Sequence, residues 1–181
     1  MSFLAKLAGF DFTSLELLQR VLLVTDGTIT DTIEVAFGEP ITLMKVSCEL
    51  LITPSDIDAL DVTAGCSLMD RKIQLLGRTT CRVYAYAETL LVIDRLPDEL
   101  RRQLLLSNTA LGRLWSEYRI EGRKELLSVT RVPVGSVRYP FTPGQHADLL
   151  KRTYRMISAG KPVSLITEYF PSSYSHDPTA V

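Results

Sequence analysis

Apolar residues follow two helical patterns near the start of the chain. The first pattern, over residues 13–24, consists of five side chains at helical spacing: Leu15, Leu17, Leu18, Val21 and Leu22. It predicts a helix capped by Thr13 or Ser14. A second helix is predicted from Thr28 to Gly38, because apolar residues recur there at i, i+4 and i+8 and Asp31 occupies a capping-box position.

Strand patterns dominate the rest of the chain. Residues 41–52 form a run of β-branched and aliphatic side chains that predicts one strand. Residues 71–76 and 81–94 flank a four-residue connection and have the outline of a long antiparallel hairpin. A final hairpin is predicted from residues 154–158 and 163–170.

The segments between these strands carry helix and loop signals. Pro54 opens a short predicted helix, and a longer helix is predicted over residues 97–106. A tight corner at residues 110–112 then leads into a predicted extended segment over 115–131. Prolines and glycines make residues 132–145 an irregular loop, which is either a flap over a ligand or a plain flexible connection.

Antiparallel hairpins interspersed with helices favour an α+β fold over a doubly wound parallel sheet. The chain has 181 residues, of which 46% are hydrophobic, so its size suits one domain and its apolar surface suffices for one core. We therefore expect a single domain over residues 1–181, in which residues 172–181 form a frayed polar tail.

Charge and hydropathy exclude several classes of partner. Twenty basic side chains stand against twenty-one acidic ones, and neither sign is gathered into a block that would attract a polyanion. Nucleic acid is therefore not expected as a ligand. No apolar stretch approaches the roughly 20 residues of a membrane span, and the first residues lack the apolar core of a signal peptide. We expect a cytoplasmic protein.

The chain offers little material for metal or nucleophile chemistry. Its three cysteines show no Cys-x-x-Cys spacing, which argues against a disulfide framework or a zinc site and fits a reducing compartment. His146 and His176 are the only histidines, and both lie in polar loop contexts. Neither a metal nor a cofactor is expected, so any chemistry would rest on carboxylates, arginines and backbone groups.

Two charged residues lie on apolar faces of predicted strands. With period-two alternation, Glu168 shares a face with Ile166 and Phe170, and Arg71 shares one with Ile73 and Leu75. Burial of an isolated charge in such surroundings costs roughly several kcal/mol of solvation free energy. A buried charge therefore needs a partner of opposite charge or a hydrogen-bonding ligand. Either these residues pair with each other or lie exposed at an edge, or they form a polar pocket that takes an anion at Arg71 and a hydroxyl at Glu168.

A second candidate for anion binding lies in the predicted final hairpin. Arg155 shares its face with Thr153 and Ile157 in the predicted final hairpin. It is either a second anion-binding residue or an exposed strand arginine, and the pattern favours the exposed arginine.

Several local strings, in chain order, resemble the chorismate pyruvate-lyase family and its cyanobacterial and actinobacterial relatives. They cover most of the chain: residues 26–30 (Asp-Gly-Thr-Ile-Thr), 71–76 (Arg-Lys-Ile-Gln-Leu-Leu), 87–97, 109–113, 154–162 and 166–171 (Ile-Thr-Glu-Tyr-Phe-Pro). The last of these is the most specific. Ala110 stands where some family members have proline, and residues 132–146 have no counterpart that can be anchored.

The resemblance implies an antiparallel sheet of about six strands, backed by helices, with the ligand buried under two helical flaps. It also implies a cofactor-independent lyase that converts chorismate to 4-hydroxybenzoate and pyruvate. Whether that product serves quinone biosynthesis or a specialised metabolite depends on the host. A monomer is expected, because no amphipathic surface is left unassigned.

The same resemblance implies roles for individual residues. Arg71 and the backbone N–H of Leu111 would bind the substrate carboxylate, and Glu168 would contact the ring hydroxyl. Arg71 and Glu168 are thus the expected catalytic pair. Further substrate contacts are expected from the flap and corner motifs, namely from Thr28, Ile29 and Gly112.

Two other functions remain open. The same architecture resembles the effector domain of a family of bacterial transcription regulators, which makes a non-catalytic small-molecule-binding module one alternative. Against it, only about forty residues precede the first predicted strand, and they are not basic as a DNA-binding domain would be. The second alternative is a lyase that acts on a related enolpyruvyl or cyclohexadiene acid.

Overall fold

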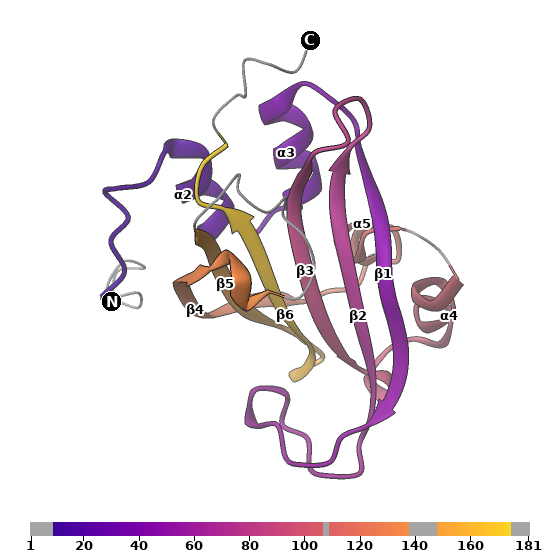
Figure 1. Ribbon diagram of the computed structural model, residues 1–181. Helices are drawn as coiled ribbons and strands as arrows, with labels where there is room; N and C mark the ends of the chain where they lie inside the picture. The colour runs from indigo at the N-terminus through magenta and orange to yellow at the C-terminus, as the bar shows by residue number, and fades with distance from the viewer. Residues whose placement is uncertain (1–8, 107–108, 138–147, 175–181) are drawn as a thin grey trace.

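The computed structural model describes residues 9–106, 109–137 and 148–174, which form one six-stranded antiparallel sheet (Figure 1). The strands are β1 (Ile41–Ile52), β2 (Ser67–Gly77), β3 (Val83–Val92), β4 (Arg123–Pro133), β5 (Asp148–Ser158) and β6 (Lys161–Pro171). Their order is β1-β2-β3-β6-β5-β4. The predicted α+β class with about six strands is confirmed. Because β6 lies between β3 and β5, the last strand of the chain occupies the middle of the sheet.

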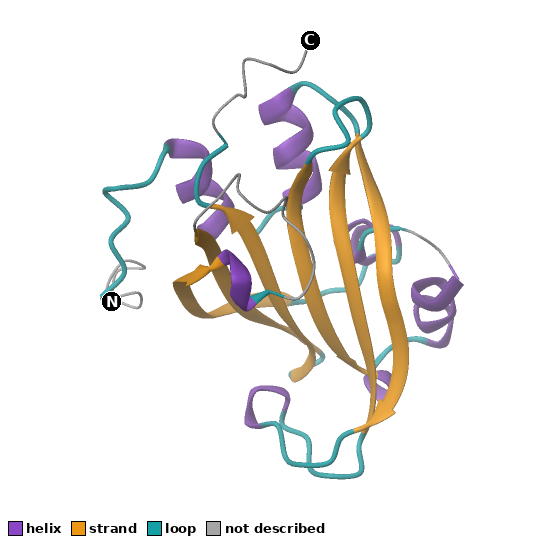
Figure 2. Cartoon of the chain, in the orientation of Figure 1, coloured by secondary structure: helices purple, strands orange, loops and turns teal. Residues whose placement is uncertain are grey.

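Within the described residues, four helices pack against the sheet (Figure 2). They are α2 (Leu17–Val24), α3 (Ile29–Phe37), α4 (Asp98–Leu106) and α5 (Leu111–Glu117), with short 3₁₀ turns at η1 (Asp58–Leu60), η2 (Ile93–Arg95) and η3 (Val134–Ser136). In the view of Figure 2, α2 and α3 lie at the upper end of the sheet, and α4 and α5 lie at its side. No helix of the described ranges is long and apolar enough to span a membrane.

The helices cover one face of the sheet with two separate apolar clusters. One cluster joins α2 and α3 to β2, β3 and β6 through side chains such as Leu22, Ile33 and Phe170. The other joins α4 and α5 to β2, β3, β5 and β6 through side chains such as Leu100 and Leu114. Together these clusters bury most of the large apolar side chains and so supply the main hydrophobic contribution to stability. The space between them is where a ligand can enter.

The first two helices differ from prediction at their N-termini. Helix α2 begins at Leu17 rather than near residue 13, because Thr13 donates to Asp11 in a separate turn and the Gln19 side chain accepts from the N–H of Glu16. Helix α3 and its end at a left-handed Gly38 are as predicted. Asp31, however, does not cap it.

The prediction of an extended segment over 115–131 is wrong for its first half. Residues 111–117 form α5, which buries Leu114 and Trp115 against the sheet, and β4 begins only at Arg123. Three apolar positions within seven residues are too few for the helical period to stand out. The predicted short helix after Pro54 is only the 3₁₀ turn η1.

The loop predicted over 132–145 is partly ordered structure, since β4 runs to Pro133 and η3 follows. Its remainder, residues 138–147, lies outside the described residues, and so does the flap considered there. Three strands are longer than predicted: β2 begins at Ser67, and β5 and β6 run over residues 148–158 and 161–171. The longer β5 matters most, because it brings Arg152 into the sheet.

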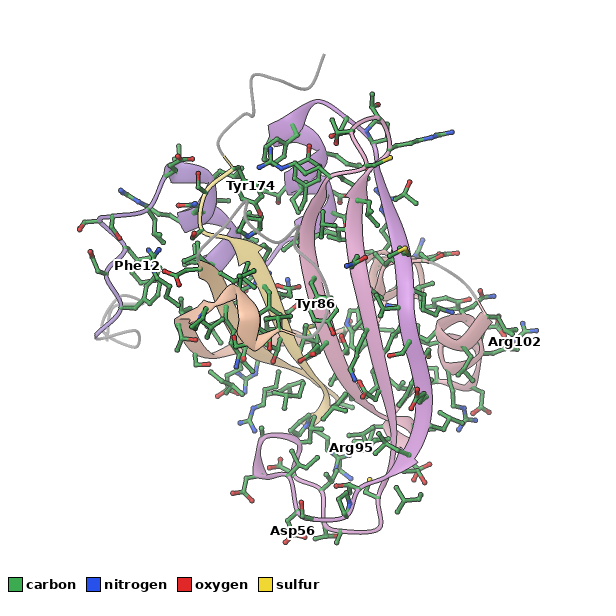
Figure 3. The ribbon with its side chains drawn as sticks, viewed as in Figure 1. Phe12, Asp56, Tyr86, Arg95, Arg102 and Tyr174 are labelled. Atoms are coloured by element: carbon green, nitrogen blue, oxygen red, sulfur yellow. The ribbon has the colours of Figure 1, made fainter. Side chains whose placement is uncertain are left out.

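The expected fraying of the tail is wrong for residues 172–174. Tyr174 is 5% exposed, its hydroxyl donates to the carbonyl of Tyr84 at 2.8 Å, and its ring lies 5.1 Å from that of Phe37. Figure 3 shows it at the end of the sheet beside α3. Residues 175–181 lie outside the described part of the chain. The opposite end of the sheet is held by Arg95, which donates to the carbonyls of Leu60, Asp61 and Pro162 (Figure 3).

A buried carboxylate joins the start of β1 to the turn between β2 and β3. Glu39 accepts hydrogen bonds from the backbone N–H groups of Thr79 and Thr80 and from the hydroxyls of Thr80 and Tyr84. Burial alone would raise the pKa of Glu39, but these hydrogen bonds outweigh it and lower the pKa from 4.5 to about 2.

Replacing Glu39 by glutamine is expected to lower the free energy of unfolding at neutral pH. A depressed pKa contributes stability that is present above the ordinary value of 4.5 and is lost as the pH falls towards about 2. The difference between wild type and Glu39→Gln in urea unfolding should therefore shrink between pH 5 and pH 2, an interval set by roughly those two pKa values. Glu117→Gln, at the exposed C-terminal end of α5, is the matched control and should show little difference. A constant gap across this pH range would contradict the assignment.

Candidate functional site

A cavity of about 490 Å³ opens between the helices and the sheet. Its floor consists of inward-facing side chains from β2, β3, β5 and β6, and its rim includes residues 26–30 and 110–112 at the N-terminal ends of α3 and α5. Its volume falls within the roughly 300–1,000 Å³ of small-molecule sites.

Arg71 and Glu168, the two charged residues on apolar faces, both line this cavity and are 2% and 4% exposed. Glu168 lies opposite Ala87 and Arg71 opposite Thr89, so strand β3 separates them. Two interstrand spacings place their backbones about 10 Å apart across the sheet. Glu168 pairs with Arg152 instead, and Arg71 donates to the carbonyl of Thr109, so the structural alternative in which Arg71 and Glu168 pair with each other is wrong. The small side chains of Ala87 and Thr89 leave room between them.

Arg71 is a buried cation with unused hydrogen-bonding capacity. Its Nη2 donates to the carbonyl of Thr109 at 2.9 Å, and its Nε has no partner within the described residues. Burial lowers the pKa of the Arg71 guanidinium, although not enough to discharge an arginine. A buried guanidinium that lacks a carboxylate partner and retains a free N–H is suited to bind an anion.

Glu168 is held by two neighbours on β5. The Nε of Arg152 donates to its Oε2 at 2.5 Å, and the hydroxyl of Tyr154 donates to its Oε1 at 2.9 Å. Burial, together with the charge of Glu168, raises the pKa of Tyr154 well above 10, which keeps this hydroxyl protonated as a donor. Burial by itself would lower the pKa of Arg152, but its pairing with Glu168 outweighs that effect and raises it. Glu168 thus presents its carboxylate to the cavity in a fixed orientation.

Arg152 was not predicted from the sequence, although the strand pattern contains a signal for it. Arg152 lies opposite Glu168 in the sheet, is 2% exposed, and also donates to the carbonyl of Thr25. On the full strand Arg152 shares a face with Leu150 and Tyr154. It is therefore a charged residue on an apolar face, which is the same signal that identified Arg71 and Glu168. The predicted strand began at residue 154 and so excluded it.

Arg155 does not line the cavity. Its Nε donates to Glu125 at 3.1 Å and its Nη1 donates to the carbonyl of Ala59, both away from Arg71 and Glu168. Because β5 alternates, Arg155 points to the face opposite to that of Arg152 and Tyr154. The expectation that Arg155 is a second anion contact is therefore not supported by its position.

The rim brings together the other predicted residues. Four of them line the cavity at the first turns of α3 and α5: Thr28, Ile29, Leu111 and Gly112. A Cβ on Gly112 would lie 3.4 Å from Cγ2 of Thr28, so the two segments pack closely. Backbone N–H groups in a first helical turn have no acceptor within the helix, and that of Leu111 is one of these. Arg113 joins the two helices further by pairing with Asp31 and Glu34.

Lys124, at the start of β4, also lines the cavity and was not identified from sequence. Its Nζ donates to the carbonyl of Gly27 at 2.9 Å and lies 5.3 Å from the centre of the Tyr154 ring. Burial and the charge of Arg152 lower the pKa of Lys124. Lys124 lies in the part of the predicted extended segment over 115–131 that is a strand, but the prediction assigned it no face.

The chain is similar to lyases in sequence, and its fold is similar to that of domains from transcriptional regulators. A family model described as "Chorismate pyruvate-lyase Rv2949c-like" matches residues 23–176. The chain is 31% identical over 162 residues to the protein named chorismate pyruvate-lyase of Mycobacterium leprae, covering 87% of this chain and 76% of that protein.

Solved structures share the fold at low sequence identity. PhnF of Mycobacterium smegmatis matches with a TM-score of 0.62 at 14% identity, over 82% of this chain and 65% of that one. The ligand-binding domain of a putative GntR-family transcriptional regulator from Bordetella bronchiseptica matches with a TM-score of 0.57 at 18% identity, over 75% of this chain and 88% of that one. At these identities the likeness concerns the fold alone.

Proposed function

The chain belongs to the Rv2949c-like chorismate pyruvate-lyase family, and from this premise we propose that it converts chorismate to 4-hydroxybenzoate and pyruvate in the cavity between α3, α5 and the sheet. The single observation that carries the choice of site is the arrangement of Arg71 and Glu168. They offer a buried cation and a buried carboxylate to one cavity, on opposite sides of strand β3.

Chorismate presents three polar groups to such a site. They are a carboxylate on the ring, a hydroxyl on the opposite ring carbon, and an enolpyruvyl ether with its own carboxylate on the carbon next to the hydroxyl. Breakage of the ring–ether C–O bond with loss of a ring proton yields an aromatic phenol, and the departing enolpyruvate becomes pyruvate on protonation. The change is redox-neutral overall, and aromatisation drives it. The protein has to hold one conformer and stabilise the charge that moves to the leaving group.

Arg71 binds the ring carboxylate in this proposal. Its planar guanidinium can donate two parallel hydrogen bonds, and the Nε without a protein partner is available for one of them. The backbone N–H of Leu111 is a further donor from the rim. Apolar contact from Ile29, in the first turn of α3, closes the site over the ring.

Glu168 accepts a hydrogen bond from the ring hydroxyl. Arg152 and Tyr154 do not need to touch the substrate for this role, because both act through Glu168 and orient its carboxylate. They are positioning residues. Thr28 and Gly112, where the two rim segments meet, shape the entrance to the site.

The test is to incubate the pure protein with chorismate and to measure pyruvate and 4-hydroxybenzoate together. Equal amounts of both products, formed at a rate proportional to protein concentration, are the expected result. Pyruvate with a different aromatic acid would instead indicate a lyase for a related substrate. Chorismate binding without turnover would instead favour an effector-binding module, which is the alternative suggested by the fold shared with transcriptional regulators.

A further inference from the structure

The proposed site leaves one polar group of chorismate without a partner, the carboxylate of its enolpyruvyl group. Within the described residues, the cationic side chains that line the cavity are Arg71, Arg123 and Lys124. Arg71 already serves the ring carboxylate. The Arg123 side chain is 69% exposed and pairs with Glu125 outside the site. Of these three, Lys124 is thus the cation that remains for a second carboxylate.

Lys124 lies at the end of the cavity where the enolpyruvyl group is expected. Its Nζ is over the ring of Tyr154, whose hydroxyl donates to Glu168. In chorismate the ether oxygen is attached next to the carbon that bears the hydroxyl, and the ring carboxylate is on the far side. When Glu168 holds the hydroxyl and Arg71 holds the ring carboxylate, the enolpyruvyl group must therefore lie towards the Glu168 end.

We propose that Lys124 binds the carboxylate of the enolpyruvyl group and thereby holds the leaving group. This inference rests on the proposed function of the site. An ammonium has three N–H donors, and the bond to the Gly27 carbonyl occupies one of them. The other two remain for a carboxylate. Gly27 belongs to the rim segment 26–30, so the same side chain connects the leaving group with the segment that borders the site.

The position of Lys124 also suits the negative charge that develops during the reaction. When the ring–ether bond breaks, its electron pair stays on the enolpyruvate oxygen, a ring proton leaves, and the enolate is protonated at its methylene carbon. Negative charge therefore grows on a fragment that already carries a carboxylate. A partly buried ammonium beside it stabilises that charge more strongly than water would. Lowering of the pKa of Lys124 by burial and by Arg152 is consistent with a cation placed to receive an anion.

The decisive comparison is between substrate and product, because 4-hydroxybenzoate lacks the enolpyruvyl group. Lys124→Met should lower kcat/KM for chorismate by about 10- to 100-fold, the effect of one lost hydrogen bond between charged groups. Its dissociation constant for 4-hydroxybenzoate, measured by calorimetry, should stay within about twofold of the wild-type value, since that ligand makes no such bond. Lys124→Arg, which keeps the cation, should recover part of the loss.

Lys151→Met is the matched control. Lys151 also lies over a tyrosine ring, with its Nζ 5.8 Å from the centre of Tyr169, but it does not line the cavity. Its replacement should change neither the kinetics nor product binding. If Lys124→Met does not fold, Lys124→Gln provides the same comparison with a side chain that still donates to Gly27.

Two results would overturn the inference. One is an unchanged kcat/KM in a folded Lys124→Met protein, and the other is an equal loss of affinity for substrate and product. Failure of the proposed function looks different, because the wild-type protein would then not release pyruvate from chorismate. In that case the comparison is made on binding: a tenfold weaker affinity of Lys124→Met for chorismate but not for 4-hydroxybenzoate supports the inference, and equal affinities overturn it.

Discussion

Replacing Arg71 by methionine is expected to reduce kcat/KM for chorismate by at least about 100-fold without unfolding the protein. Loss of a buried charge partner for a ligand carboxylate is worth about 2–5 kcal/mol of binding to the transition state. Stability should be unchanged or higher, because Arg71 is a buried cation without a carboxylate partner in the described residues and methionine relieves its desolvation. Steady-state kinetics and urea unfolding of the same preparation measure both effects.

Arg71→Lys distinguishes a planar fork from a simple charge. A lysine at this position keeps the cation but cannot form two parallel hydrogen bonds, so it should recover only a small part of the activity. Arg131→Met, at an exposed position of edge strand β4, is the control for loss of an arginine and should behave like wild type. A folded Arg71→Met protein with full activity would refute the assignment of Arg71.

The second large effect is expected at the ion pair between Arg152 and Glu168. Glu168→Gln and Arg152→Met should each lower the free energy of unfolding by about 3–5 kcal/mol, because each leaves one buried charge without its partner. The double variant should lose much less than the sum of the two, since neither charge remains in the interior. Urea unfolding of the four proteins gives this coupling directly.

Activity separates the roles of the two residues within the same cycle. If Glu168 contacts the substrate, the double variant regains stability but not activity. A double variant that recovers both would show that Glu168 only supports the structure. The exposed pair of Asp98 and Arg101 on α4 is the control: Asp98→Asn, Arg101→Met and their double variant should show a coupling of at most about 1 kcal/mol. Strictly additive losses at residues 152 and 168 would contradict the buried ion pair.

Sequence patterns predicted the fold class, the central hairpins and two residues of the candidate site. They could do so because both inferences are local. Alternation along a strand states which side chains share a face whatever the strand pairs with, so Arg71 and Glu168 stood out among Ile73, Ile166 and Phe170. The same rule failed for Arg152 only because the start of β5 was placed six residues too late.

Short elements were the weakest predictions. Helix α5 has seven residues, and its burial of Leu114 and Trp115 depends on the sheet beneath it rather than on its own periodicity. The docking of Tyr174 against Phe37 and Tyr84 is likewise a contact between distant segments. Neither can be recognised within a window of neighbouring residues, so residues 111–117 and 172–174 were assigned wrongly.

By itself, the sequence determined that this is an antiparallel α+β protein with Arg71 and Glu168 on apolar faces, because side-chain alternation and turn residues act over short range. Only the tertiary structure decided what those charges meet. The placement of β6 between β3 and β5 keeps Arg71 and Glu168 apart, and strand register puts Arg152 opposite Glu168. Chain segments more than a hundred residues apart thus form one cavity. The partners of the charged residues in it are set by strand pairing across the sheet, which no local pattern encodes.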